Sequence, residues 1–186
     1  MYKELDEQSL ARACSEGDRM AEDELYTRYA ARVLTLCRRY TSSNDDAKDL
    51  MQESLLKALE KIGTYTYTGK GSLSGWISRI AINRAINDIK RRRWRLVSLD
   101  FNRLEDSPDP TEEELMTIPQ ERLLQWISGL PDMRRTVFNL YCIDGYSHKE
   151  IAKLLSISEK GSASELAKAR KQLKQEINRY LKETEI

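Results

Sequence analysis

The chain has 186 residues, of which 40% are hydrophobic and 33% charged, and only eight glycines and four prolines interrupt it, so we expect an all-helical protein with one or two modest cores. Three widely spaced cysteines in apolar helical patterns, Cys14, Cys37 and Cys142, argue against a disulfide framework or a zinc ribbon, so we expect them to be reduced packing residues. No apolar run reaches the ~20 residues that span a bilayer, and we therefore expect a cytoplasmic protein without membrane insertion. The formal net charge of +1 conceals a segregation of sign along the chain.

Two amphipathic helices are predicted in the first part of the chain. Asp18 is a plausible N-cap for the first, in which apolar residues at spacings of three and four share one face from Leu25 to Tyr40. After a break at residues 41–44, Asp45 and Asp46 suit the first turn of the second helix, which extends to about residue 62. The polar face of this second helix carries Asp49, Gln52, Glu53, Lys57 and Glu60.

A glycine-rich loop is predicted over residues 63–71, and a third long helix from about Ser72 to Arg95. Tyr65 and Tyr67 find little core to enter from a loop and would suit stacking on unpaired bases. Trp76 is either a core residue or a base-stacking platform, and the basic run over 90–95 is either a nucleic-acid contact or a solvated helix end. A polar stripe at near-helical intervals consists of Arg79, Asn83, Asn87 and Lys90.

Residues 96–117 contain two prolines, three consecutive glutamates and no apolar period, so we expect a flexible acidic linker between two domains, 1–95 and 118–186. The helical pattern resumes past Pro119, restarts after Pro131 and stops at Gly145.

The charge segregation follows the same division. Seven basic residues stand beside Asp88 alone in residues 76–95, and nine basic residues outnumber four acids in residues 145–182. In residues 96–120 the balance reverses, with seven acids against Arg103. Two basic blocks separated by an acidic spacer predict two contacts with a polyanion.

A helix-turn-helix is predicted over residues 147–173. Ser147 and Glu150 form a capping box that begins a short helix, and Ser158 can cap a second helix after a pause. The small Ala152 allows the two helices to cross closely, and Ile157 can close the base of the turn. The second helix could then enter a major groove and contact bases and phosphates.

Four segments resemble bacterial sigma factors of the extracytoplasmic-function group. Residues 46–58 are similar to the polymerase-binding helix, 71–83 to the segment that melts and recognises the minus-ten element, and 130–138 and 145–152 to the domain that recognises the minus-thirty-five element. Together they follow the family's order along most of the chain. The resemblance implies a non-enzymatic factor without cofactor or metal, which directs core RNA polymerase to promoter DNA and is regulated by an anti-sigma factor in a stress or envelope response.

The resemblance also implies roles for individual residues. Core polymerase would be bound by Asp49, Gln52, Glu53 and Lys57. Minus-ten DNA would be bound by Tyr65, Thr66, Tyr67, Lys70, Trp76, Arg79, Asn83, Asn87, Lys90 and Arg91. Minus-thirty-five DNA would be bound by Ser147, Lys160, Ser162, Ser164, Lys168, Arg170 and Lys171. The acidic linker would thread polymerase channels that otherwise hold nucleic acid, or it is a plain solubilising tether.

The helix-turn-helix departs from the family at three positions. Ser156 stands where the family usually has glycine in the turn, Ser162 where it has an apolar residue, and Glu165 where it has arginine. Glu165 either accepts a hydrogen bond from a cytosine amino group or points away from DNA. The minus-thirty-five sequence therefore does not follow from the resemblance.

Two other classes of protein compete with this interpretation. A regulator with a ligand-sensing or dimerising N-terminal half would explain the second basic block but neither the first block nor the tyrosine loop. An enzyme is poorly supported, because the single histidine, His148, lies in the capping box where we expect it to be exposed, and no phosphate loop or metal-ligand spacing is present.

Overall fold

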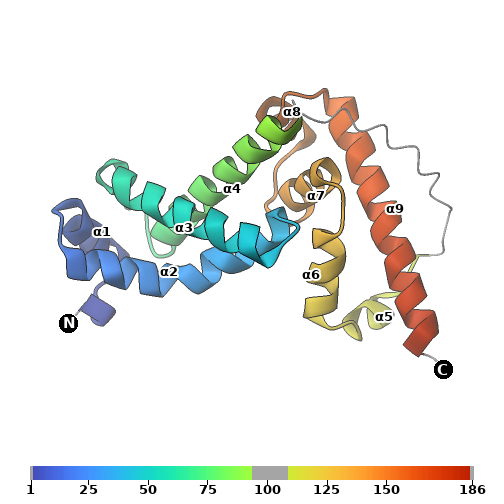
Figure 1. The fold of residues 1–186 in the computed structure, drawn as a ribbon, viewed down its shortest axis with the longest axis horizontal. Helices are drawn as coiled ribbons and strands as arrows, with labels where there is room; N and C mark the ends of the chain where they lie inside the picture. Colours follow the sequence, from blue (N-terminus) through green and yellow to red (C-terminus); the bar gives the residue numbers. More distant parts are fainter. Residues whose placement is uncertain (1, 94–108, 185–186) are drawn as a thin grey trace. The chain divides into compact units, whose positions relative to one another are not determined.

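A computed structural model describes residues 2–93 and 109–184, and within these ranges every regular element is a helix, which confirms the expected fold class (Figure 1). The chain divides into two compact units, Met1–Asn87 and Asp88–Ile186. The division falls within the third predicted long helix, a little before the predicted domain end at residue 95. Most of the predicted linker, including Arg103, lies outside the described residues.

The first unit contains η1 (Tyr2–Glu4), α1 (Glu7–Ser15), α2 (Arg19–Tyr40), α3 (Asn44–Lys61), η2 (Ile62–Thr64) and the greater part of α4 (Ser72–Arg93). Helices α2 and α3 pack side by side, and α1 packs against both α2 and η2 (Figure 1). Each of the first three α-helices begins at a side-chain cap, supplied by Asp6, Asp18 and Ser43. The predicted cap at Asp18 is thereby confirmed.

The core of the first unit is apolar. The predicted buried face of α2 is confirmed, with Leu25, Val33 and Tyr40 each at most 2% exposed. On α4, Leu73 and Ile77 are also buried. Ile80 is only partly buried, and Ile82, Ala85, Ile86 and Ile89 complete the inward face of the helix.

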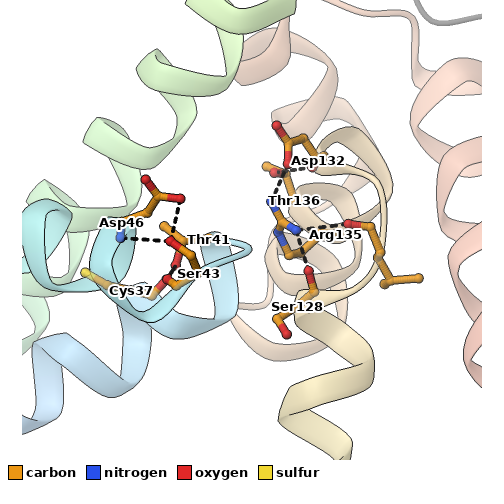
Figure 2. Close-up of polar contacts among 9 residues, drawn as sticks. Cys37, Thr41, Ser43, Asp46, Ser128, Asp132, Arg135 and Thr136 are labelled. Carbon is orange, nitrogen blue, oxygen red and sulfur yellow. Dashed lines mark hydrogen bonds and ion pairs between the residues drawn. The ribbon is translucent and has the colours of Figure 1, made fainter.

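Hydroxyl groups are the polar side chains buried in the described part of this core. The Thr41 hydroxyl donates to the carbonyl oxygen of Cys37 at 3.0 Å, and the Ser54 hydroxyl donates to that of Leu50 at 2.5 Å. Figure 2 shows the first of these contacts beside the Ser43 cap of α3. Hydroxyls satisfied by a carbonyl one turn back are inexpensive to bury, since no charge is removed from water.

The second unit contains α5 (Glu112–Met116), α6 (Gln120–Ser128), α7 (Asp132–Phe138), the π-helix η3 (Asn139–Ile143), α8 (His148–Leu155) and α9 (Glu159–Thr184). Helices α6, α7 and α8 all pack against α9. Helix α5 lies within the stretch that was expected to be irregular. It forms because Thr111 and Glu114 make a capping box, a local pattern that the acidic composition obscured.

The helix-turn-helix of the second unit is confirmed in its local details. Ser147 and Glu150 make the predicted capping box, and the Ser158 hydroxyl accepts the Gly161 N–H at 2.9 Å. Ser156 ends α8 in the left-handed conformation with φ of 55°, a conformation that favours the glycine expected in this turn from the family resemblance. Helix α9 continues to Thr184, well beyond the predicted end of the motif at residue 173.

Arg134 and Arg135 are buried within the described part of the second unit. The Arg135 guanidinium, with a side chain 2% exposed, donates to the carbonyl oxygens of Ser128 at 2.7 Å and Leu130 at 2.9 Å, and it also pairs with Asp132 (Figure 2). Ser128 and Leu130 lie at the end of α6 and just beyond it. Arg135 therefore satisfies carbonyl groups that a helix end leaves without partners.

The three cysteines do not share one environment. Cys14 and Cys37 are buried as predicted, and burial raises their thiol pKa values to about 11 and about 12. Cys142 is exposed on η3, so its expected role as a packing residue is wrong. Its apolar sequence neighbours suggested an inward face, but the π-helical turn places it outward. No helix in the described ranges is long and apolar enough to cross a membrane.

Candidate nucleic-acid interface

One face of α3 presents polar residues together with an exposed leucine. Asp49, Gln52 and Glu53 are exposed, as the sequence predicted. Leu56, one turn further along the same face, is 62% exposed. We call these four residues the α3 stripe. Sequence analysis missed Leu56, although its spacing of four residues from Gln52 places it on the polar face, whereas Leu55 is buried.

Two predicted polymerase-binding residues make ion pairs within the first unit. Glu53 pairs with Arg84 of α4, and both side chains remain partly exposed. Lys57 is half-buried and contacts Glu60 at 2.6 Å, which lowers the pKa of the Glu60 carboxyl group. Exposed pairs of this kind are weak, so either carboxylate can exchange its partner for another donor.

The loop after η2, residues 65–71, presents an aromatic and a basic side chain to solvent; we call it the aromatic loop. Thr66, Tyr67 and Lys70 are exposed, with Tyr67 at 38%. Tyr65 is half-buried instead: its ring lies 5.5 Å from that of Trp76, and its hydroxyl is 2.5 Å from the Ser72 hydroxyl oxygen. The expectation that both tyrosines lack a packing partner is therefore wrong for Tyr65.

Helix α4 carries the predicted polar stripe on its exposed side. Arg79, Asn83, Asn87 and Arg91 are exposed, and Lys90 is partly exposed. Arg91 makes a surface pair with Asp88 at 3.2 Å, while Trp76 is partly buried beside Tyr65. The aromatic loop leads directly into α4, and we call the exposed residues Arg79, Asn83 and Asn87 of this helix the α4 stripe.

Helix α9 presents a second cationic surface. Lys160, Ser164, Lys168 and Arg170 are exposed and Lys171 is partly exposed; we call these residues the α9 face. Ser147 is exposed at the start of α8, where its hydroxyl is engaged in the capping box. The predicted sites of the second unit therefore lie on α9 and at the beginning of α8, with one exception.

Ser162 is the exception. It is fully buried, and its hydroxyl lies 2.9 Å from Nδ1 of His148. A side chain without solvent access does not contact DNA, so its expected role in minus-thirty-five recognition is wrong. The small hydroxyl allows α8 and α9 to approach each other.

His148 is half-buried rather than exposed as expected. Its ring stacks on that of Tyr141, with the two centroids 4.4 Å apart. The Arg170 guanidinium lies 5.9 Å from the centroid of the same Tyr141 ring. Arg170 also donates to Sγ of the exposed Cys142 at 3.8 Å. These contacts join η3, α8 and α9 at one end of the helix-turn-helix.

Glu165 is held by basic residues of its own unit. One carboxylate oxygen lies 3.6 Å from Nε of the buried Arg134, and the other accepts from Nζ of Lys168 at 2.8 Å. Its side chain is 23% exposed. Of the two alternatives for this carboxylate, the geometry favours a structural pair over contact with a base.

No cluster of three or more His, Cys, Asp or Glu side chains suited to a metal ion occurs among residues 2–93 and 109–184. The surfaces that these residues do form are polar, aromatic and basic, which suits binding to macromolecules.

Comparison with known proteins identifies the family. Two family models match the chain, Sigma-70 region 2 over residues 25–95 and Sigma-70 region 4 over residues 120–173. The ECF RNA polymerase sigma-E factor of Haemophilus influenzae is 28% identical over 188 residues, covering 95% of this chain and 98% of that protein. The RNA polymerase sigma-H factor of Pseudomonas aeruginosa is 26% identical and covers 98% of this chain and 100% of that protein.

A solved structure shares the fold. It is the sigma factor RpoE in complex with the anti-sigma factor NepR from Bartonella quintana, with a TM-score of 0.50, 19% sequence identity and coverage of 83% of this chain and 94% of that one. The sequence matches extend over both units described above and preserve their order. The chain belongs to the extracytoplasmic-function group of bacterial sigma factors.

Proposed function

We propose that this chain binds core RNA polymerase through the α3 stripe and directs it to promoters through the aromatic loop, α4 and the α9 face. The observation that carries the proposal is that both family-matched regions turn their polar, aromatic and basic residues outward on these segments. Such a factor needs no catalytic centre of its own, and it acts in the cytoplasm with the polymerase.

The α3 stripe suits a protein partner better than DNA. Asp49 and Glu53 would repel phosphates, whereas carboxylates beside an exposed Leu56 supply both a polar contact and an apolar anchor. Gln52→Ala and Leu56→Ala should each weaken core polymerase binding about fivefold to tenfold, with the fold intact. Lys48, exposed on α3 outside the stripe, provides the matched control as Lys48→Ala. Unchanged affinity in both stripe variants would remove this assignment.

The aromatic loop and α4 suit a melted minus-ten strand. Tyr67 is exposed in the loop two residues after Tyr65, so an extruded base has an aromatic ring on which to stack, an interaction of about 1–3 kcal/mol per base. Opening a duplex costs about 1.4 kcal/mol per step, and trapped bases offset part of that cost. The α4 stripe of Arg79, Asn83 and Asn87 would hold the adjoining backbone.

The α9 face suits duplex DNA at the minus-thirty-five element. The capping box and the left-handed turn at Ser156 set the angle between α8 and α9, so that α9 can enter a major groove. Lys160, Ser164 and Arg170 would contact bases or phosphates. Glu165 would stay with Arg134 and Lys168, which reduces repulsion of the phosphates.

Regulation by an anti-sigma factor forms part of the proposal. The solved relative with the same fold was captured with the anti-sigma factor NepR. A similar partner for this chain would cover its polymerase- and DNA-binding surfaces until a stress or envelope stimulus releases it.

Run-off transcription with purified core polymerase on a promoter library is the decisive experiment. We expect initiation at a defined promoter class only when the chain is added. A chain that instead binds an operator without polymerase would be a regulator of the two-domain type. Promoter binding by the holoenzyme should also weaken with salt, each phosphate contact adding about 0.9 to the log–log slope; a flat dependence would contradict the cationic surfaces.

A further inference from the structure

Helix α1 reaches across the first unit to the beginning of α4. The Glu7 carboxylate accepts the backbone N–H groups of Gly71 at 2.8 Å and Leu73 at 3.2 Å, both on Oε2. Its other oxygen, Oε1, accepts the hydroxyl of Tyr29 on α2 at 3.1 Å. One side chain thus joins three elements, and its partners on α4 lie more than sixty residues away in sequence.

These contacts do the work of a helix cap. The first amides of an α-helix have no partner within it, and a side chain at the N-cap position usually accepts one of them. At the start of α4 that position is occupied by Gly71, which has no side chain. Gly71 has φ of +87°, a conformation that favours glycine. Glu7 supplies the missing acceptor, and its negative charge suits the positive end of the helix dipole.

The capped turn also holds the aromatic loop. Ser72 stands in sequence between the two residues whose amides Glu7 binds. Its side-chain oxygen lies 2.5 Å from the Tyr65 hydroxyl and accepts the Thr68 N–H at 3.4 Å. At the other end of the loop, η2 packs against α1. Helix α1 therefore fixes both ends of the segment that carries Tyr65, Tyr67 and Lys70.

We propose that Glu7 is a positioning residue for promoter melting: it clamps the aromatic loop in the conformation that receives an extruded base. This inference rests on the proposed function of that loop. Glu7 lies outside the range matched by Sigma-70 region 2, which begins at residue 25, and it does not itself contact DNA in this proposal. It acts through Gly71 and Leu73, so that the loop is already ordered when a base arrives.

The experiment compares Glu7→Ala and Glu7→Gln in the full-length chain assembled with core polymerase. Binding to a single-stranded minus-ten oligonucleotide should weaken about fivefold to twentyfold in Glu7→Ala, the range that corresponds to the loss of a helix cap. Glu7→Gln keeps a neutral acceptor oxygen and should lie between Glu7→Ala and the wild type. Glu16→Ala provides the control, because Glu16 lies just beyond α1 and makes only a surface pair with Arg12 among the contacts described.

Two further measurements separate positioning from general destabilisation. The penalty should disappear on an oligonucleotide with an abasic site at the extruded position, and affinity for core polymerase should stay unchanged. Equal loss of polymerase binding, or an equal penalty on the abasic strand, would overturn the proposal by showing that Glu7 serves only the fold. Wild-type affinity in Glu7→Ala would overturn it as well.

Hydrogen exchange in the free protein tests the clamp without DNA. The amides of Gly71 and Leu73 should exchange about tenfold faster in Glu7→Ala than in the wild type, while amides in the middle of α3 keep their rates. Unchanged exchange at both amides would refute the clamp even if the aromatic loop binds DNA. A third outcome is that the exchange changes as expected while the wild-type holoenzyme does not bind the minus-ten strand. That outcome would refute the proposed function of the loop and its positioning by Glu7, but it would leave the assignment of Glu7 as a helix cap in place.

Discussion

The two units bury different kinds of polar group. Among the described residues of the first, the buried polar side chains are the hydroxyls of Thr41, Ser54 and Ser74. Among those of the second, they include the side chains of Arg134 and Arg135, two residues at 4% and 1% exposure. Both units are helical and both present basic surfaces, so the difference does not arise from their outward faces.

Short helices contribute to this difference. Helices α2, α3 and α4 have 22, 18 and 22 residues, whereas α6, α7 and α8 have nine, seven and eight. Every helix end leaves backbone groups without partners whatever its length, so short helices carry more such groups per residue. Arg135 satisfies two carbonyl groups near the end of α6 and thereby offsets this cost. The short helices α6 and α7 thus bring a charged group into the core of the second unit, although α9 of the same unit has 26 residues.

The largest expected effect comes from Arg135→Met. Removing the guanidinium leaves two buried carbonyls and Asp132 without this donor, so the second unit should lose about 3–5 kcal/mol of unfolding free energy. Denaturant unfolding, followed by hydrogen exchange in each unit, measures the loss and assigns it. Arg179→Met, at a side chain 65% exposed on α9, should change stability by less than about 0.5 kcal/mol. A stable Arg135→Met variant would break the comparison.

A pair of neighbouring leucines tests the apolar core of the first unit. Leu55 is fully buried and Leu56 is 62% exposed on the same helix. Leu55→Ala should cost about 3 kcal/mol of unfolding free energy, because it removes buried methyl groups and leaves a cavity. Leu56→Ala should cost less than about 0.5 kcal/mol and affect polymerase binding instead. Similar losses in both variants, measured by chemical denaturation, would contradict the assigned faces.

Acid should weaken the helix caps of both units. Asp18 accepts hydrogen bonds from the Tyr2 hydroxyl and from the amides of Ala21 and Met20, and these lower its pKa below the ordinary 3.8. The pKa of Glu150 is likewise lowered by the Ser147 hydroxyl and backbone N–H. A lowered pKa in the folded state stabilises the protein above the ordinary value, and this contribution is lost as the pH falls through the folded value. Between about pH 5 and about pH 3, the melting temperature of the Asp18→Asn variant should fall less than that of the wild type, because asparagine does not titrate. An identical slope would exclude this contribution.

The smallest effect concerns thiol reactivity. Burial raises the pKa values of Cys14 and Cys37, whereas Cys142 is exposed. Iodoacetamide should therefore modify Cys142 in the native protein and reach the other two thiols only on unfolding. Mass spectrometry of the labelled chain checks this order. Rapid native labelling of Cys37 would show that the core of the first unit opens readily.

Local patterns determined much of the fold directly from sequence. The caps at Asp18, Ser147 and Ser158 and the buried face of α2 follow from spacings of three and four residues, which a helix converts into contact. The exposed polar stripe of α4 follows from the same spacings. Such interactions need no knowledge of the rest of the chain.

Only the tertiary structure decided the fate of residues whose partners are distant in sequence. Ser162 and Ser164 look alike in sequence, yet Ser162 is buried against His148 while Ser164 is exposed. Likewise, nothing near Glu7 in the sequence reveals that it caps a helix beginning more than sixty residues later. Helical periodicity assigns a residue to a face, but the packing of neighbouring helices determines whether that face is buried and which polar groups meet there.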